Sequence, residues 1–422
     1  MAESLETIFK GAIIGDAAGY TLNGLKKAHI NAVFHELQGF TDTAPALKHG
    51  MEKWRKPGLY SSITQFMILA GACTETRFFN AEKFSDAVKN APELPDHDYS
   101  YFRDPGAAEK NFITFAGTLP AGQARFDHPC ARIIPVSLPA LLMRMNGENL
   151  IIPVFRFVSL FTSDIPTALS SAILVHIIDQ ANPENTVSLF EQAMISSAAV
   201  ASYVEENQHL LFELGYNPDY VINEAHCINT IIRKVSASGS ITSSEQVIIT
   251  EVNKKLKTPV TRASVNLPFT VFPFAISIAA NTANPPDVFL AAAAEGGASS
   301  AIASIAGALT CARFGDCIPP GLEEGLINRK KILSMTADIA AGRNRDQVIK
   351  ELSSQESSLT KKEHEEFLAK NRKSVRKKSP GSEKKQGKPV DLLSKHIVES
   401  WTKIDKAKWK KEKNRNNEDP EL

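Results

Sequence analysis

The chain has 422 residues, 43% of them hydrophobic, which is enough for a sizeable buried core. Its five cysteines form no Cys-x-x-Cys pair, which excludes a zinc ribbon and a disulfide framework and favours a reducing, cytoplasmic setting. The net charge of +1 hides an asymmetry, because residues 361–422 carry about +8 and the preceding residues about −7. We therefore expect one large body and a distinct basic tail.

The sequence predicts neither a secretory signal nor a transmembrane segment. The N-terminus lacks a basic start followed by an apolar run. The most apolar stretch, 267–283, contains Pro268 and Pro273 and is shorter than the about 20 residues that span a bilayer. We expect it to be a buried helix.

Apolar residues at helical spacing open the chain and lead into Gly15-Asp16-Ala17-Ala18-Gly19. The two glycines predict a compact turn that allows close backbone approach. Further along, Ser61-Ser62-Ile63-Thr64 opens an apolar helix that reaches about Thr74. Serine and threonine are typical caps of helix N-termini, so a purely structural role for these hydroxyls is one interpretation.

Residues 90–128 are interrupted by prolines and contain two candidate metal-binding stretches, Asp96-His97-Asp98 and Asp127-His128. Neither has the spacing of a known site, so we predict no metal there. Helices are expected over 130–145, 167–181, 187–206 and 220–233. If Arg132 is buried, it needs a carboxylate or carbonyl partner, and it then braces the fold.

The central stretch begins at Gly296-Gly297, continues through small and apolar residues to Gly315, and is followed by Pro319-Pro320. Glycine and proline at these places are typical of helix boundaries. The small side chains predict close packing against neighbouring helices. The first turn of this buried helix would offer backbone N–H groups to a ligand.

Four of these stretches, in this order, resemble the signatures of the ADP-ribosylglycohydrolase family. Gly15–Gly19 resembles Gly-Asp-Ala-Leu-Gly, 61–64 resembles Thr-Asp-Asp-Thr, Arg132 and Pro135 match a third motif, and 296–301 resembles Gly-Gly-Asp-Thr-Asp-Thr. The resemblance implies an all-α multi-helix domain over residues 1–345. It also implies hydrolysis of ADP-ribosyl bonds with two magnesium ions held by the aspartates.

The chain departs from these signatures where the family's chemistry resides. The positions of the family's metal-binding aspartates hold Ser62, Ile63, Ala298 and Ser300. Asn23 stands where the family has a glutamate, and Ser163 where it has a histidine. Neutral side chains do not offset two divalent cations, so we expect no metal cofactor, and the family mechanism does not carry over.

The leading hypothesis is a pseudoenzyme whose former cleft binds ADP-ribose, a nucleotide or a protein partner without magnesium. The residues predicted to bind are those that open the two helices: Ser61, Ser62, Thr64, Gly296, Gly297, Ser299 and Ser300. The rival hypothesis is a metal-independent or atypically metallated hydrolase of ADP-ribosyl or related glycosidic bonds. In its metal-free form, Asp16 is the general base and Asp127 or Asp164 the helper.

The C-terminal region is predicted to differ from the body. Residues 346–390 are polar and rich in Lys and Ser, which predicts a flexible linker, and 391–422 predicts a basic amphipathic helix. A third hypothesis makes the body a scaffold and lets residues 372–415 bind nucleic acid, an anionic membrane or an acidic protein. A solvated tail that only aids solubility is the alternative.

Overall fold

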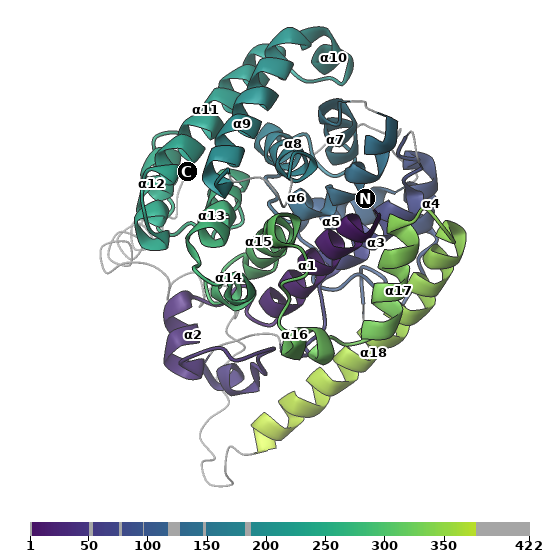
Figure 1. Ribbon diagram of the computed structural model, residues 1–422. Helices are drawn as coiled ribbons and strands as arrows, with labels where there is room; N and C mark the ends of the chain where they lie inside the picture. The colour runs from purple at the N-terminus through teal and green to yellow at the C-terminus, as the bar shows by residue number, and fades with distance from the viewer. Residues whose placement is uncertain are drawn as a thin grey trace, which may run out of the picture. The chain divides into compact units, whose positions relative to one another are not determined.

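The computed structural model describes residues 2–49, 54–75, 78–95, 97–116, 127–146, 149–181 and 187–376. The chain divides into one unit over Met1–Arg372 and another over Lys373–Leu422, and the structure below is that of the first. Within the described ranges the chain forms helices and no strand, which confirms the all-α prediction (Figure 1). None of these helices is long and apolar enough to cross a membrane.

The helices, with η marking 3-10 turns, are α1 (Ala2–Tyr20), α2 (Lys27–Phe34), η1 (Ala44–His49), α3 (Ser62–Cys73), α4 (Ala81–Lys89), α5 (Ala107–Phe115), α6 (Ile133–Val136), η2 (Leu138–Asn146), α7 (Ile151–Val158), α8 (Ile165–Asp179), α9 (Leu189–Glu206), α10 (Gln208–Glu213), α11 (Pro218–Ser236), α12 (Ile241–Asn253), α13 (Pro268–Asn281), η3 (Pro285–Asp287), α14 (Val288–Ala293), α15 (Ser299–Phe314), α16 (Pro320–Gly325), α17 (Arg329–Ala340) and α18 (Arg345–Arg376).

The first helix and α15 lie side by side at the centre of the unit (Figure 1). A methyl group on Gly15 would lie 2.0 Å from the carbonyl oxygen of Ala303, and one on Gly19 would lie 2.3 Å from that of Ser299. Only glycine permits this approach, and the two positions, four residues apart, lie on one face of α1. The predicted turn at 15–19 is wrong, because these residues continue α1, but the predicted close backbone approach is confirmed.

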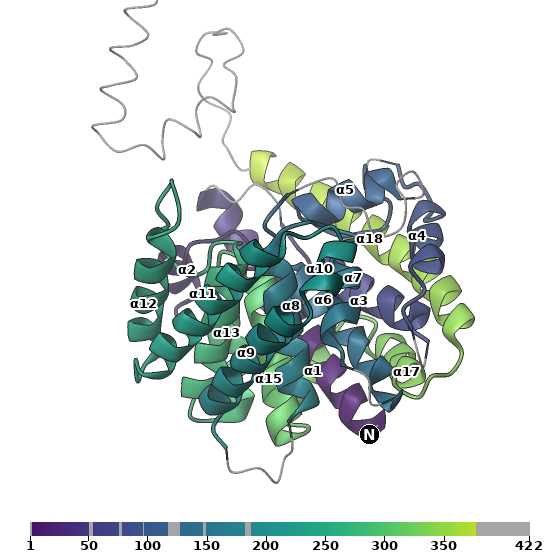
Figure 2. The same ribbon diagram turned by 90° about the horizontal axis from the view of Figure 1, so that it is seen from above.

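Other apolar helices surround this central pair. Helices α13 and α14 pack against α15, and α8, α9, α11 and α13 form a neighbouring group (Figure 2). Twelve of the fourteen residues of α13 are buried, so the apolar stretch around Pro273 is a core helix, as predicted. Helix α3 is buried along its whole length and packs against α6 and η2. Both helix starts that carry the candidate residues therefore lie inside the core.

Three of the four predicted middle helices appear close to their expected bounds, as α8, α9 and α11. The fourth, expected over 130–145, is wrong as a continuous helix, because α6 ends at Val136 and a 3-10 segment follows. Pro139 explains the change, since it has no N–H to donate to the carbonyl of Pro135.

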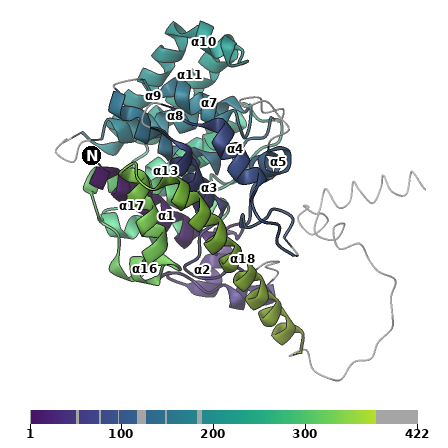
Figure 3. The same ribbon diagram turned by 90° about the vertical axis from the view of Figure 1, so that its right-hand side faces the viewer.

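The flexible linker predicted over 346–390 is wrong for its described part, where α18 forms one continuous helix of 32 residues (Figure 3). Its buried residues recur at helical spacing, but most are polar: Val348, Leu352, Glu356, Thr360 and Glu363. A polar stripe of this kind gives little hydropathy signal, although its partners in the core satisfy it. Residues 377–390 and the tail predicted over 391–422 lie outside the described residues.

Candidate functional site

Asp16 joins the first helix to the start of α3. Its carboxylate accepts hydrogen bonds from the backbone N–H and hydroxyl of Ser61, at 3.0 and 2.7 Å, and from those of Thr64, at 3.2 and 2.8 Å. The side chain is fully buried, and burial raises its pKa although these hydrogen bonds oppose the shift. Both carboxylate oxygens are thus occupied, as in a helix cap contributed by a second helix.

A buried ion pair completes the start of α3. Nε of Arg132 donates to Glu109 at 2.8 Å, and Nη2 donates to the hydroxyls of Ser62 at 2.8 Å and Ser61 at 3.2 Å. Ser62 in turn donates to Glu109 at 2.7 Å. Burial would lower the pKa of Arg132, but the charge of Glu109 holds it above its ordinary value. The bracing role predicted for a buried Arg132 agrees with this geometry.

Sequence reasoning missed Glu109. It occupies the third position of α5, and its carboxylate also accepts from the backbone N–H of Gly106. A glutamate three residues after a helix cap is a recognisable signal. That signal does not predict that the same carboxylate also pairs with Arg132, which comes from another segment.

The residues at the signature positions do not fit magnesium. The guanidinium of Arg132 lies within hydrogen-bonding distance of the Ser61 and Ser62 hydroxyls, so a metal ion there would face a fixed positive charge. Ile63 and Ala298 have no side-chain oxygen to offer. No group of three or more His, Cys, Asp or Glu in the described ranges could hold a metal ion.

The turn that opens α15 is clamped by backbone hydrogen bonds. Gly296 and Gly297 have φ of 63° and 57°, a region that favours glycine. The N–H of Gly297 donates to Leu25 at 2.7 Å, and the N–H of Ala298 donates to Ser264 at 2.8 Å. The N–H of Ala298, one of the groups expected to face a ligand, therefore already donates to an acceptor within the chain.

The two serines that follow differ from each other. The Ser299 hydroxyl donates to the carbonyl of Gly19 at 2.7 Å. Ser300 is also completely buried, but its hydroxyl has no partner in the described part of the chain. The same holds for Ser304, one turn further along α15. Among the predicted ligand-binding side chains, Ser300 is therefore the one whose polar atom the described residues leave unused.

Asn23, at the position of the family's glutamate, lies beside a carboxylate from another segment. Its side-chain amide donates to Asp104 at 3.3 Å, and Arg55 donates to the same oxygen at 2.7 Å. Arg55 also donates to the backbone oxygen of Asn23 at 2.9 Å. Sequence reasoning missed Asp104, because nothing in its local pattern places it near residue 23.

The two carboxylates predicted as helpers lie elsewhere. Asp164 caps α8 by accepting from the backbone N–H and hydroxyl of Thr167, at 2.8 and 2.6 Å. Burial raises its pKa to about 6 despite these hydrogen bonds, and the charge of Asp127 adds to the shift. Asp127 is exposed. Among the described contacts, no hydrogen bond joins either residue to Asp16.

Comparison with known proteins supports the order of elements described above. A solved structure of an ADP-ribosylglycohydrolase-related protein complex superposes with a TM-score of 0.52 at 14% sequence identity, covering 81% of this chain and 98% of that chain. This likeness shows a shared fold. No curated protein sequence matches the chain. The sequence model of the ADP-ribosylglycohydrolase family matches residues 7–348, and the chain therefore belongs to that family.

Proposed function

We propose that this protein is a metal-independent binding member of its family, which holds ADP-ribose or a related nucleotide at the opening turn of α15 and does not hydrolyse it. Membership of the family supports the ligand class. The neutral residues at positions 62, 63, 298 and 300 support the independence from metal, since none is a carboxylate.

The observation that carries the proposal is the buried hydroxyl of Ser300, which has no partner in the described structure. A buried polar group left unpaired costs about 1–3 kcal/mol, and a hydrogen bond to a ligand oxygen would recover that cost. Ser300 is the second residue of a 16-residue helix, where backbone N–H groups and the helix dipole favour an anionic or oxygen-rich group. Phosphate and ribose oxygens both meet this description.

Binding without hydrolysis follows from the state of the polar groups at the start of α3. Asp16 accepts four hydrogen bonds, and Arg132 is bound to Glu109 and two serines. A general base needs a free lone pair within hydrogen-bonding distance of the proton that it removes. To provide one, Asp16 would have to give up hydrogen bonds that it accepts from Ser61 or Thr64 at the start of α3.

A metal-free hydrolase is the second candidate, and the observation that favours it is Asp104. This carboxylate lies beside Asn23, and its side chain is 24% exposed, whereas Asp16 is fully buried. Asp104 also stands at a positive φ of 50°, a strained backbone for a residue with a side chain. In this candidate Asp104, rather than Asp16, would act as the base.

Isothermal titration of the full chain with ADP-ribose, in EDTA and in magnesium, tests the first proposal. We expect binding in both buffers with the same affinity. Ser300→Ala should weaken it about 3- to 10-fold, the value of one hydrogen bond. Ser304→Ala is the matched control, because it removes an equally buried, unpartnered hydroxyl one turn away. Absence of binding in EDTA, or an equal loss in both variants, contradicts the proposal.

The second candidate is tested by the release of free ADP-ribose from an ADP-ribosylated protein in EDTA. No release is expected. Turnover that Asp104→Asn abolishes and Asp16→Asn leaves in place would replace the binding proposal by the hydrolase.

A further inference from the structure

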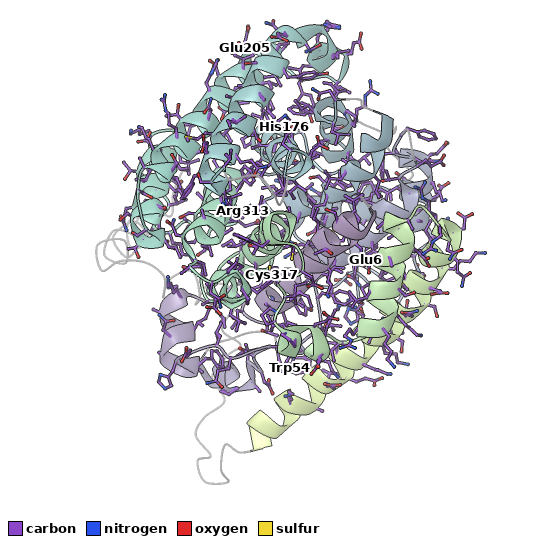
Figure 4. The ribbon with its side chains drawn as sticks, in the orientation of Figure 1. Glu6, Trp54, His176, Glu205, Arg313 and Cys317 are labelled. Carbon is purple, nitrogen blue, oxygen red and sulfur yellow. The ribbon has the colours of Figure 1, made fainter. Side chains whose placement is uncertain are left out.

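Two of the five cysteines, Cys311 and Cys317, lie together at the C-terminal end of α15. Cys311 belongs to the last turn of the helix and is 2% exposed. Cys317 follows the helix and is partly exposed. Figure 4 labels Cys317, with its sulfur in yellow, close to α15. One thiol of the pair is therefore open to solvent and the other is enclosed by the protein.

The end of α15 turns the chain so that the two thiols meet. The N–H of Gly315 donates to the carbonyl of Cys311 at 3.0 Å, and the φ of Gly315 is 72°, a region that favours glycine. This hydrogen bond is typical of a helix stop, after which the chain folds back over the last turn. The N–H of Cys317 then donates to the carbonyl of Gly315 at 2.9 Å. As a result, the thiol of Cys311 donates a hydrogen bond to the sulfur of Cys317.

Helix α1 holds the same region from its other side. A methyl group on Gly11 would lie 2.6 Å from the sulfur of Cys311 and 2.6 Å from the carbonyl oxygen of Gly307. The thiol thus occupies space that a side chain at position 11 would fill. Lys10, the preceding residue, pairs with Asp316 at 2.9 Å and ties the segment between the two cysteines to α1. The fold therefore holds the two sulfur atoms together before any reaction.

The two thiols differ in reactivity. The hydrogen bond from Cys311 lowers the pKa of Cys317, although burial and the charge of Asp316 oppose the shift. The same hydrogen bond, together with burial, raises the pKa of Cys311. The thiolate is the form of cysteine that attacks a disulfide. Exposure and pKa thus both make Cys317 the thiol that reacts first, and they leave Cys311 to react second.

The other three cysteines lack this arrangement. Cys73 and Cys130 are buried, and burial raises the pKa of each thiol to about 12. Cys227 is partly exposed, but burial raises its pKa as well, and its hydrogen-bonding partner is Lys255. Cys227 is therefore a natural control, a partly exposed cysteine that has no thiol partner among the described contacts.

We propose that Cys317 and Cys311 are a modification site that reacts with a small-molecule disulfide, RSSR, and closes to an intramolecular disulfide. The Cys317 thiolate attacks one sulfur of RSSR, so that a mixed disulfide forms and one RS⁻ leaves. The Cys311 thiolate then attacks the sulfur of Cys317, the mixed disulfide breaks, and the second RS⁻ leaves. Each RS⁻ takes up one proton, which balances the protons lost by the two cysteines. Two thiols are oxidised, and one RSSR is reduced to two RSH.

The disulfide joins the end of α15 to the segment that leads into α16. An excess of RSH reverses the reaction by the same exchange, so the state of the pair follows the ratio of RSSR to RSH. Cys311 follows Ser300 by 11 residues along α15, which is about 16 Å at the rise of an α-helix. The pair shares no residue with the ligand site proposed above and stands or falls separately from it.

Peptide mapping of the full chain after incubation with oxidised glutathione tests the proposal. Free thiols are alkylated, the protein is unfolded, and trypsin is added. Arg313 lies between Cys311 and Cys317 in the sequence, so trypsin places the two cysteines on separate peptides. These peptides stay joined only where the disulfide has formed. We expect the joined peptides in the oxidised sample and their loss after treatment with dithiothreitol.

Variants test the order of the two steps. Cys311→Ser should stop the reaction after the first step, with one glutathione retained on Cys317. Cys317→Ser should abolish the joined peptides and leave Cys311 unmodified, because that thiol is enclosed and has a raised pKa. Cys227→Ser is the control and should leave the yield of the joined peptides unchanged.

Three results would overturn the inference. The first is the absence of the joined peptides from the oxidised wild type, a result that does not depend on whether any variant folds. The second is joined peptides that form only in urea, which would show that the folded chain keeps the two sulfur atoms apart. The third is glutathione on Cys227 of Cys311→Ser to the same extent as on Cys317, which would show that exposure alone decides the reaction.

Discussion

The starts of α3 and α15 both contact α1, at Asp16 and at Gly19, yet the hydrogen bonding of their polar groups differs. At α3, the hydroxyls of Ser61, Ser62 and Thr64 are all hydrogen-bonded, through Asp16 and the Arg132–Glu109 pair. At α15, backbone carbonyls fix the glycine turn and the Ser300 hydroxyl stays unpaired in the described structure. The start of α3 thus has a closed hydrogen-bond network, whereas the start of α15 has a hydroxyl without a partner in the described structure.

The difference arises from the segments that reach each helix start. Charged side chains from α5 and from the residue before α6 meet α3, and together they form a neutral pair. The backbone of Leu25 and Ser264 meets the turn before α15, where it offers acceptors to the glycine turn. A closed network stabilises the fold, whereas an unpaired buried hydroxyl is a cost that a ligand can remove.

The largest effect is expected from Glu109→Ala, which breaks the closed network at the start of α3. The variant leaves the Arg132 guanidinium buried, at 4% exposure, without its carboxylate. Breaking a buried ion pair by removing one partner costs about 3–5 kcal/mol, and we expect the free energy of unfolding in urea to fall by that amount.

Lys254→Ala gives the matched control, because it removes a 59% exposed lysine from its ion pair with Glu251. Exposed pairs contribute about 0–1 kcal/mol. If the two variants lose similar amounts, the pair at α3 does not hold the network together, and the contrast between the two helix starts fails.

Asp164 extends the comparison to a third helix start, where a buried carboxylate caps the helix and forms no ion pair with a cation among the described contacts. Burial raises its pKa from 3.8 to about 6, against the hydrogen bonds from Thr167. The native state therefore holds this proton at pH values where the unfolded chain has lost it. The contribution to stability is present in full below pH 3.8 and is lost as the pH rises through 6.

We expect the free energy of unfolding of the wild type, relative to Asp164→Asn, to fall by about 2 kcal/mol between pH 4 and pH 7. Chemical denaturation at both pH values measures the difference. Asp219→Asn, which changes an exposed carboxylate at the start of α11, should show no comparable trend. A trend of opposite sign would mean that a cation pairs with Asp164 in solution.

Local sequence patterns predict the all-α fold and the positions of the helix starts. Glycines four residues apart in α1 and the small side chains of α15 predict the close contact that the structure places at Gly15 and Gly19. The hydroxyls of Ser61 and Thr64 fit the capping interpretation, and Ser61 is indeed the cap of α3. Such features depend on residues close together in sequence, so pattern alone reveals them.

The partners of the site could not be predicted in this way. Glu109 meets Arg132 and Asp104 meets Asn23 only because separate segments fold together, and no periodicity marks those pairs. The sequence predicts a linker over most of α18 because the buried stripe of this helix includes Glu356 and Glu363. Their donors, among them Arg103 and Tyr20, lie some 250 residues or more away in the chain. Polar residues buried by distant partners look exposed to any hydropathy argument.

The smallest effects are expected from a paired comparison of two buried serines, one at the start of each helix: Ser62→Ala and Ser300→Ala. The first variant takes a donor from Glu109 and an acceptor from Arg132 in a buried site, which costs about 1–3 kcal/mol. The second removes a hydroxyl that pairs with nothing in the described structure, so the ligand-free protein should change by less than about 0.5 kcal/mol or become more stable.

Urea titration with and without ADP-ribose distinguishes the roles of the two serines. A ligand that binds only the folded state raises the free energy of unfolding in proportion to the logarithm of its concentration over Kd. We expect ADP-ribose to stabilise Ser62→Ala as much as the wild type and Ser300→Ala less. Equal stabilisation of all three proteins would place the ligand away from α15, and a loss of stability in ligand-free Ser300→Ala as large as that in Ser62→Ala would show that the Ser300 hydroxyl has a partner within the chain.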